Sequence, residues 1–418
     1  MSVSLSGKPF NRHRLSTLWV HGTVGRAERL ERASAAVLLV LGAAATLTTW
    51  VRSPLLAWGY ALGVFLLAGM WTARDVLTPR AVRITLPGAT LGAISLWGFA
   101  QLGLGATVYR YATLDAAVRT AALGATVFAA SRALRSARLR LQFLTAFAWF
   151  GFAMSVAAVL TYFTSPGRVL WIFPSPYPDT WGPFLSRNDF AGFLELSFPV
   201  ALWLCLSDRP ARGSPRIPAS IPAPIPAWML AAGLASASRA GAILLVIEAI
   251  AIFAITGRRK AMGKFAMAAA VFIAIAGAGT LLGRLADPDP LAGRREIARS
   301  TVDMIAAHPW RGFGLGTFAQ VYPAYATFDV GAAVEHAHND WLEWAAGGGV
   351  PYAAAWAALA VALCAPAVRS VWGLGIVAAF LHAMVDYPFA RFGLTAWTFA
   401  LIGALEADSL RELRGRVH

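Results

Sequence analysis

A succession of long apolar runs constrains this chain more than any other feature of its sequence. Of its 418 residues, 58% are hydrophobic and 14% are charged, whereas an ordinary soluble domain is about half apolar and about a quarter charged. One to three soluble domains cannot hide so much apolar surface from water, so the solvent for these runs is a lipid bilayer. We therefore predict an all-α polytopic integral membrane protein, and a soluble enzyme is excluded.

About 12 spans of about 20 residues each account for the apolar runs and leave no room for a large soluble domain. We interpret residues 1–418 as a single transmembrane domain. Cys205 and Cys364 both fall in apolar runs and are interpreted as small core residues. The predicted spans lie near residues 33–51, 55–73, 84–109, 112–130, 143–163, 190–207, 226–238, 242–256, 265–283, 341–365, 371–388 and 393–405.

The distribution of Lys and Arg supports this count and predicts the orientation of the chain. The sequence holds 36 Lys and Arg against 21 Asp and Glu, a formal net charge of +15. Cytoplasmic loops of membrane proteins collect basic residues. Twenty-four of the 36 fall on alternate loops when the N-terminus is placed in the cytoplasm. The pattern predicts that both termini are cytoplasmic.

The other twelve basic residues are all arginines on the predicted outer side, where the orientation rule does not require them. Arginine donates two parallel hydrogen bonds to phosphate and keeps its charge, so one interpretation is a site for an anion. The alternative is that they reach lipid head groups or pair with carboxylates. The twelve are Arg52, Arg110, Arg119, Arg168, Arg187, Arg239, Arg284, Arg294, Arg295, Arg299, Arg311 and Arg391.

The longest predicted outer loop comprises residues 284–340, and we expect it to carry catalytic elements. A helical pattern runs over 293–307 and ends at His308-Pro309, because proline disfavours helix in the residue before it. The glycine-rich stretch 312–316 predicts a tight turn. A nucleotide-binding loop would instead follow a strand and open a helix.

Two patterns in this loop leave a metal site open as an alternative. Asp287-Pro-Asp289 has the spacing with which carboxylates hold a divalent cation, although aspartate before proline is typical of a turn. His336, His338 and Asp340 alternate, and an extended backbone would present all three to one side, as zinc or manganese requires.

A different interpretation uses one histidine of this loop as a general base. Neutral imidazole, with an ordinary pKa of about 6.5, accepts a proton at physiological pH. A hydroxyl acceptor needs such a base, and a diphosphate leaving group needs fixed positive charge. A histidine beside arginines at a membrane surface supplies both. The plain alternative is a hydrogen-bonded residue at the start of a helix.

Two polar pairs are spaced four residues apart within predicted spans. Asp115 and Arg119 would face each other on a helix, which favours a mutually neutralising pair. His382 and Asp386 have the same spacing, and two interpretations stay open: a polar pair that packs the bundle, or a wall of the site.

Several motifs occur along the chain in the order in which one known family carries them. They are Gly293-Arg294, His308-Pro309-Trp-Arg-Gly312-Phe-Gly314-Leu-Gly316-Thr-Phe318, His338-Asn339-Asp-Trp-Leu342 and Gly349-Val-Pro, supported by Ser186-Arg187-Asn188-Asp-Phe-Ala191-Gly192, Ser238-Arg239-Ala-Gly241 and His382-Ala-Met-Val-Asp386. Together they resemble the bacterial O-antigen ligase and polymerase superfamily. One departure is Tyr352, at a position where the family usually has a second glycine after Gly349.

The resemblance implies a glycosyltransferase with a GT-C-like bundle in the bacterial inner membrane and an active site facing the periplasm. It implies that an O-antigen glycan passes from undecaprenyl diphosphate to a sugar hydroxyl of lipid A–core oligosaccharide, by an inverting reaction without metal or other cofactor. The implied partners are these two substrates and membrane lipid, not nucleic acid. The matching positions would be His338 as general base, Arg187, Arg239 and Arg294 as diphosphate ligands with Arg295 as a helper, and Asn188 and Asn339 as positioning groups.

Two other functions remain as alternatives. An O-antigen polymerase would use the same donor with a second undecaprenyl-diphosphate-linked glycan as acceptor. From a different class, a transporter of lipid-linked glycans would also have about 12 spans with buried charges. The two halves of the chain show no convincing similarity, whereas transporters are often built from internal repeats.

Overall fold

The structure is a computed structural model that describes residues 12–78, 85–207, 221–276, 292–327, 329, 331 and 333–415. Its described part is helical apart from one antiparallel hairpin, in which β1 (Arg168–Val169) pairs with β2 (Phe173–Pro174). The helices are α1 (Arg12–Leu47), α2 (Pro54–Leu77), α3 (Leu86–Gly103), α4 (Arg110–Ala133), α5 (Ala137–Thr164), α6 (Arg187–Leu206), α7 (Pro224–Ala235), α8 (Arg239–Thr256), α9 (Arg259–Ala276), α11 (Ala292–Ala307), α12 (Phe318–Val321), η1 (Tyr322–Ala324), α13 (Asp340–Gly348), α14 (Val350–Ser370), α15 (Leu374–His382), η2 (Pro388–Ala390) and α16 (Phe392–Gly415).

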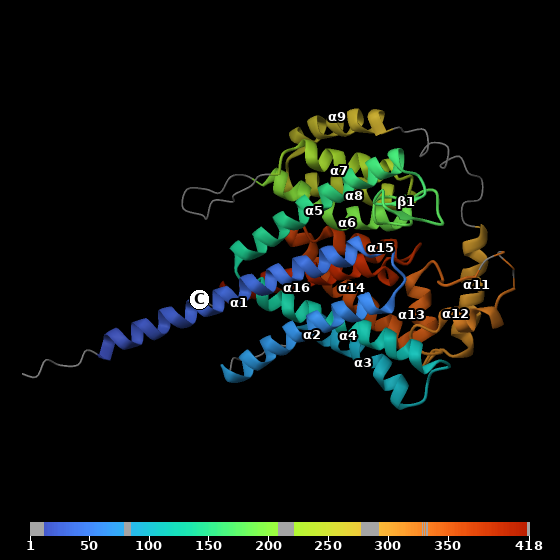
Figure 1. The fold of residues 1–418 in the computed structure, drawn as a ribbon, viewed down its shortest axis with the longest axis horizontal. Coiled ribbons are helices and arrows are strands. Elements are labelled where there is room, and N and C mark those ends of the chain that lie inside the picture. The colour runs from blue at the N-terminus through green and yellow to red at the C-terminus, as the bar shows by residue number, and fades with distance from the viewer. Residues whose placement is uncertain are drawn as a thin grey trace, which may run out of the picture.

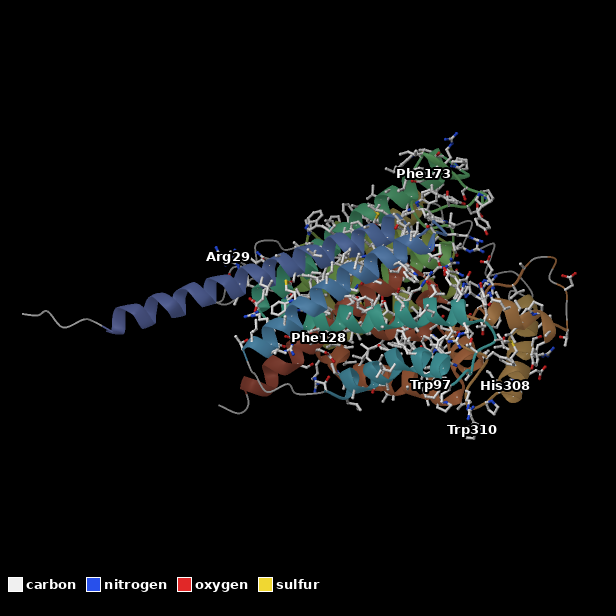
Figure 2. All side chains as sticks on the ribbon, turned by 60° about the horizontal axis from the view of Figure 1, so that its bottom comes forward. Arg29, Trp97, Phe128, Phe173, His308 and Trp310 are labelled. Carbon is white, nitrogen blue, oxygen red and sulfur yellow. The ribbon has the colours of Figure 1, made fainter. Side chains whose placement is uncertain are left out.

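The long helices form a bundle whose two ends differ (Figure 1). The first part of α1 and the end of α16 lie at one end, and α11, α12 and the hairpin lie at the other. We call the second the α11 end. Figure 2 shows His308 and Trp310 there and Arg29 at the opposite end. Segments that the sequence predicts to be outer loops therefore lie at the α11 end.

Six of the described helices are long and apolar enough to cross a bilayer. The sequence prediction of an all-α membrane protein agrees with this architecture. The number of about 12 crossings and the GT-C-like arrangement stay predictions. The six segments are Ala27–Leu47, Pro54–Leu77, Ala137–Thr164, Arg187–Leu206, Arg239–Thr256 and Val350–Ser370.

Two predicted spans differ from the helices that form. The predicted span 341–365 is divided into α13 and α14 at Gly349, whose φ is +80°. A Cβ atom there would lie 2.6 Å from the backbone of Trp310, so the break lets a loop pack against the chain. The predicted span 371–388 is helical only as far as His382. Residues 277–283 of another span, and Asp287 and Asp289, lie outside the described residues.

Helix α6 is the centre of the bundle and supports the site. Its sequence from Phe190 to Leu206 is apolar apart from Glu195 and Ser197, the pattern of a helix buried nearly all round, and 83% of its span is buried. Phe193 packs on Phe147 of α5, and Phe147 stacks on Trp397 of α16 with ring centroids 4.3 Å apart. The N-terminus of α6 is thereby held on a rigid support.

The glycine-rich stretch is the predicted tight turn, and it joins the loop to the bundle. Gly312, Gly314 and Gly316 all have positive φ, a conformation that glycine adopts without strain. Between them the backbone N–H of Phe313 donates to the carbonyl of Ala346 (3.0 Å). The N–H of Gly314 likewise donates to the carbonyl that follows Ala346 (2.9 Å). The turn thus fixes α11 against α13.

Replacing Gly312 with alanine should weaken this junction. The added Cβ would lie 2.3 Å from the carbonyl oxygen of Gly347, and the alanine would have to keep a φ of +63°. We expect a loss of about 2 kcal/mol of stability or more, seen as a lower melting temperature of the purified protein. Gly92→Ala is the matched control, since nothing lies within 4 Å of its Cβ position. Equal melting temperatures of the two variants would contradict a rigid junction.

Candidate active site

Three helices of the site begin at a capping side chain. Ser186 Oγ accepts a hydrogen bond from a backbone N–H in the first turn of α6 (3.1 Å), and Ser238 Oγ does the same in α8 (3.4 Å). Asn339 Oδ1 accepts from the first turn of α13 (3.0 Å). Such caps fix the residue at which a helix starts. These caps therefore fix the positions of Arg187 and Arg239, the first residues of α6 and α8, and the start of α13.

Asp386 is the hub of the site, and it was not among the predicted site residues. Its carboxylate accepts a hydrogen bond from the side-chain amide of Asn188 and another from the backbone N–H of Tyr387 (3.0 Å). Its oxygens lie 3.5 Å from His338 Nδ1 and 3.7 Å from a guanidinium nitrogen of Arg294. One acid thus connects three of the predicted residues. Of the two interpretations of Asp386, these contacts favour the wall of the site, which stays a prediction.

The surroundings of Asp386 keep its carboxyl ionised. Its side chain is only 8% exposed, and burial alone raises the pKa of a carboxyl. The neighbouring His338 imidazole and the positive charge of Arg294 outweigh burial and lower the pKa of Asp386 below its usual value. A fixed negative charge therefore faces His338 at neutral pH.

His338 is held in an unusual backbone conformation that aims its ring at this carboxylate. Its φ is +52°, in the left-handed region that few non-glycine residues adopt. The ring also packs edge-on against Tyr387 (4.9 Å), and the side chain keeps 31% exposure. A histidine whose Nδ1 faces a carboxylate presents Nε2 as its proton acceptor. The general-base role of His338 stays a prediction, which this orientation favours.

Arg294 and Asn339 fasten neighbouring segments to the backbone just before Asp386. A guanidinium N–H of Arg294 donates to the carbonyl of Val385 (2.6 Å), and the Asn339 amide donates to that of Met384 (2.7 Å). Arg295, the next residue of α11, is exposed. The structure therefore places Arg294 in the cluster, and the helper role of Arg295 stays a prediction.

A cavity of about 390 Å³ lies beside this cluster and is lined by three arginines, Arg52, Arg187 and Arg391. We call it the arginine cavity. Tyr387 and Asp179 also line it, as do residues 235–237, which lead directly into Arg239 at the start of α8. Two of the four arginines predicted to bind diphosphate, Arg187 and Arg239, thus lie in or next to one cavity.

Sequence reasoning gave no individual role to Arg391, which the structure places at the centre of this wall. Its Nε lies 3.2 Å from Asp189 Oδ2, and its guanidinium donates to the Tyr387 hydroxyl (2.7 Å). The cation also lies 4.6 Å from the centre of the Tyr387 ring. The only signal in the sequence was its membership of the outer arginines, because its partner Asp189 is remote along the chain.

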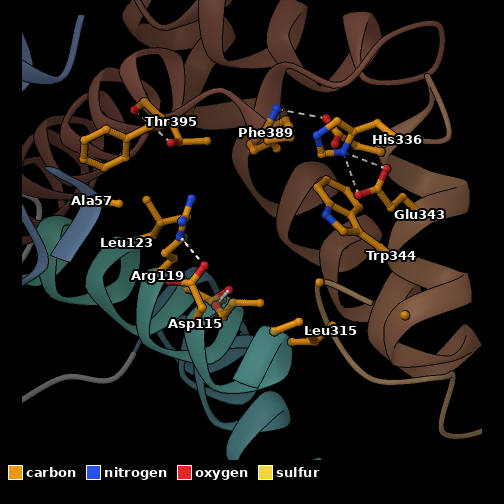
Figure 3. Close-up of a pocket in the computed structure, with 18 of the residues that line it drawn as sticks. Ala57, Asp115, Arg119, Leu123, Leu315, His336, Glu343, Trp344, Phe389 and Thr395 are labelled. Carbon is orange, nitrogen blue, oxygen red and sulfur yellow. Dashed lines mark hydrogen bonds and ion pairs between the residues drawn. The ribbon is translucent and has the colours of Figure 1, made fainter. Parts of the chain in front are cut away.

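A second cavity, of about 450 Å³, is lined in part by residues 389, 390 and 392, which neighbour Arg391 along the chain. Figure 3 shows its lining. We call it the tyrosine cavity. It is lined by Tyr109, Tyr111, Asp115, Arg119, Gln320, His336, Glu343, Trp344 and Phe389, among others. The predicted pair is confirmed, since Arg119 Nε lies 2.8 Å from Asp115 Oδ2. His336 Nδ1 is likewise 3.0 Å from a Glu343 oxygen.

The three alternating residues of the possible metal motif contact different partners. His336 faces Glu343, His338 faces Asp386, and the buried Asp340 accepts a hydrogen bond from a backbone N–H in η2 (2.9 Å). The expected extended strand does not form because His338 has a positive φ. Within the described ranges, no group of three or more His, Cys, Asp or Glu side chains is placed to hold a metal ion.

His382 does not pair with Asp386, four residues further along. It is buried in the bundle, and its Nδ1 lies 2.8 Å from Glu195 of α6. Helix α15 ends at His382, so Asp386 follows on a turn and not on the same helical face. The i, i+4 interpretation therefore fails, and the histidine serves to join α15 to α6.

Comparison with known families gives one match. Residues 226–357 match the family model described as O-Antigen ligase. The matched segment contains Arg239, Arg294 and His338, whereas Arg187 and Asp386 lie outside it. No curated protein matches the chain.

Proposed function

We propose that this chain, whose residues 226–357 match the family model described as O-Antigen ligase, is an O-antigen ligase. Its donor is an O-antigen polysaccharide on undecaprenyl diphosphate, and its acceptor is a sugar hydroxyl of lipid A–core oligosaccharide. The reaction takes place at the periplasmic face of the inner membrane, with both chain termini in the cytoplasm. The observation that supports this most is the His338–Asp386 contact beside a cavity lined by arginines.

In the proposed reaction His338 Nε2 takes the proton of the acceptor hydroxyl. The hydroxyl oxygen forms a bond to the anomeric carbon of the donor sugar as the bond from that carbon to the diphosphate oxygen breaks. The electron pair leaves with undecaprenyl diphosphate, and the anomeric configuration inverts. Asp386 holds the ring of His338 and offsets the positive charge that it gains.

Fixed positive charge supports departure of the diphosphate. Arg187 lines the arginine cavity, and Arg239 closely follows lining residues 235–237 along the chain. Arg294 lies 3.7 Å from Asp386. Guanidinium groups stay charged and match phosphate oxygens in pairs. The N-termini of α6 and α8 point the positive ends of their dipoles the same way. This set of charges supplies the role that a divalent cation has in other glycosyltransferases, so we propose that the reaction needs no metal.

The decisive test uses the purified protein with lipid-linked O-antigen and lipid A–core, in the presence of a chelator. Products are separated on a gel and probed for both glycan and core. Glycan joined to core supports a metal-independent ligase. Longer glycan that stays on the polyprenyl carrier means a polymerase. Unchanged substrates that merely change leaflet in vesicles would overturn both and indicate a transporter.

Arg187→Ala should weaken use of the donor. Removing one charge-assisted partner of the diphosphate is expected to raise the donor KM at least about tenfold and to lower kcat as well. Arg168→Ala is the control, because Arg168 is exposed and donates to a carbonyl within its own hairpin. An unchanged donor KM in Arg187→Ala would remove this residue from the diphosphate site.

A further inference from the structure

We propose that the tyrosine cavity binds the sugar end of the acceptor, while the arginine cavity takes the donor diphosphate. This inference rests on the proposed glycosyl transfer and adds where the second substrate lies. The occupant is an oligosaccharide that presents a free hydroxyl to His338.

The two cavities share one wall, the segment 387–392. Tyr387 and Arg391 face the arginine cavity, whereas Phe389 and Phe392 face the tyrosine cavity. A donor in one and an acceptor in the other would therefore lie on the two sides of a single segment, and their reacting ends would meet at its beginning. The catalytic cluster lies at this stretch, because Asp386 immediately precedes it.

The two histidines, His336 and His338, also have different neighbours. His336 lines the tyrosine cavity and stacks on the Tyr387 ring (4.5 Å), whereas His338 meets that ring edge-on and faces Asp386. The positive φ of His338 produces this divergence, since extended backbone would send both side chains to one side. His336 thus connects the lining of the tyrosine cavity to the Tyr387 ring, which His338 contacts at its edge.

The charges of the two cavities differ in the direction that this assignment requires. The arginine cavity has three arginines and one acid, Asp179, in its lining. The tyrosine cavity has one arginine, Arg119, against the carboxylates of Asp115 and Glu343, while burial raises the pKa of its third acid, Asp340, well above the usual value. A diphosphate is attracted to the first and repelled from the second. The second suits an uncharged polyhydroxyl compound, whose hydroxyls donate to carboxylates.

The remaining lining has the chemistry of a saccharide site. Tyr109 and Tyr111 are 46% and 54% exposed and offer ring faces to a sugar. The Asp115–Arg119 and His336–Glu343 pairs provide fixed donors and acceptors within reach of ring hydroxyls. A volume of about 450 Å³ is within the usual range of small-ligand sites. It accommodates the end of an oligosaccharide, whereas a lipid would remain in the bilayer.

The test separates acceptor from donor by kinetics. Tyr111→Ala removes an exposed ring, and Asp115→Asn removes a charge while keeping the size of the side chain. Each is expected to raise the KM for lipid A–core at least about tenfold and to leave the donor KM unchanged. Trp310→Ala is the matched control, since Trp310 is an exposed aromatic residue (73%) of the α11 end that lines neither cavity. Its acceptor KM should equal that of the unmodified protein.

A binding measurement without donor keeps the inference separate from the proposed function. Core oligosaccharide freed from lipid A is titrated into the purified full chain, and Tyr111→Ala should weaken binding about tenfold. Unaltered binding and acceptor KM in both variants, with transfer intact in the unmodified protein, would overturn the cavity assignment alone. Tyr111-dependent binding without any transfer would instead overturn the proposed reaction and leave the cavity as a saccharide site.

Discussion

His338→Ala should abolish glycan transfer while the protein still folds and binds its donor. The acceptor hydroxyl then loses the group that takes its proton, and a positioned base contributes about 10²–10⁴-fold to a rate. We expect kcat to fall by that factor in the assay with lipid-linked O-antigen and lipid A–core. The melting temperature should change little, because the side chain is 31% exposed.

His308→Ala is the matched control for this variant. His308 is also exposed at the α11 end, but its ring packs on Phe313 and it is remote from Asp386. Its transfer rate should stay within a factor of about two of the unmodified protein. Normal transfer by His338→Ala would remove His338 from the reaction, whatever the control showed.

Asp386→Asn should have the second largest effect, although it changes few atoms. The variant keeps the shape of the side chain but removes the negative charge that faces His338, Arg294 and Asn188. Without that charge the ring of His338 is no longer fixed with Nε2 as acceptor, and its protonated form is less stable. We expect kcat to fall by about 10² or more, with a smaller change in the donor KM.

Asp303→Asn provides the comparison, since Asp303 is an exposed acid of α11. It removes one negative charge from the same end of the molecule without touching the cluster. If both variants lost activity equally, general electrostatics at this end would explain the effect and the hub role of Asp386 would be wrong. A loss confined to Asp386→Asn identifies the contact with His338 as its cause.

The helical membrane fold followed from sequence because apolar runs are local signals. The helix 292–307, its end at His308 and the turn at Gly312 follow from proline and glycine chemistry, and all three form as expected. The break at Gly349 was not foreseen. It depends on the close approach of the backbone of Trp310, a contact between segments that no local pattern encodes.

The candidate site, like the fold, could be predicted from the sequence only in part. His338, Arg294 and Asn188 were found by resemblance, and they do meet at one carboxylate. The carboxylate itself, Asp386, was left undecided, because spacing along a helix paired it with His382 and the helix ends before it. Arg391 was missed for a related reason, since its partner Asp189 is brought to it by the packing of the bundle.

The position of the hub along the chain has a consequence for biogenesis. Chains are made and inserted from the N-terminus, and Asp386 follows Arg187, Arg294 and His338 along this chain. These three residues are therefore synthesised before the carboxylate that His338 and Arg294 face in the folded protein. A partly inserted chain that ends before Asp386 therefore lacks the carboxylate that contacts His338, and the cluster can form only after residue 386 has been synthesised.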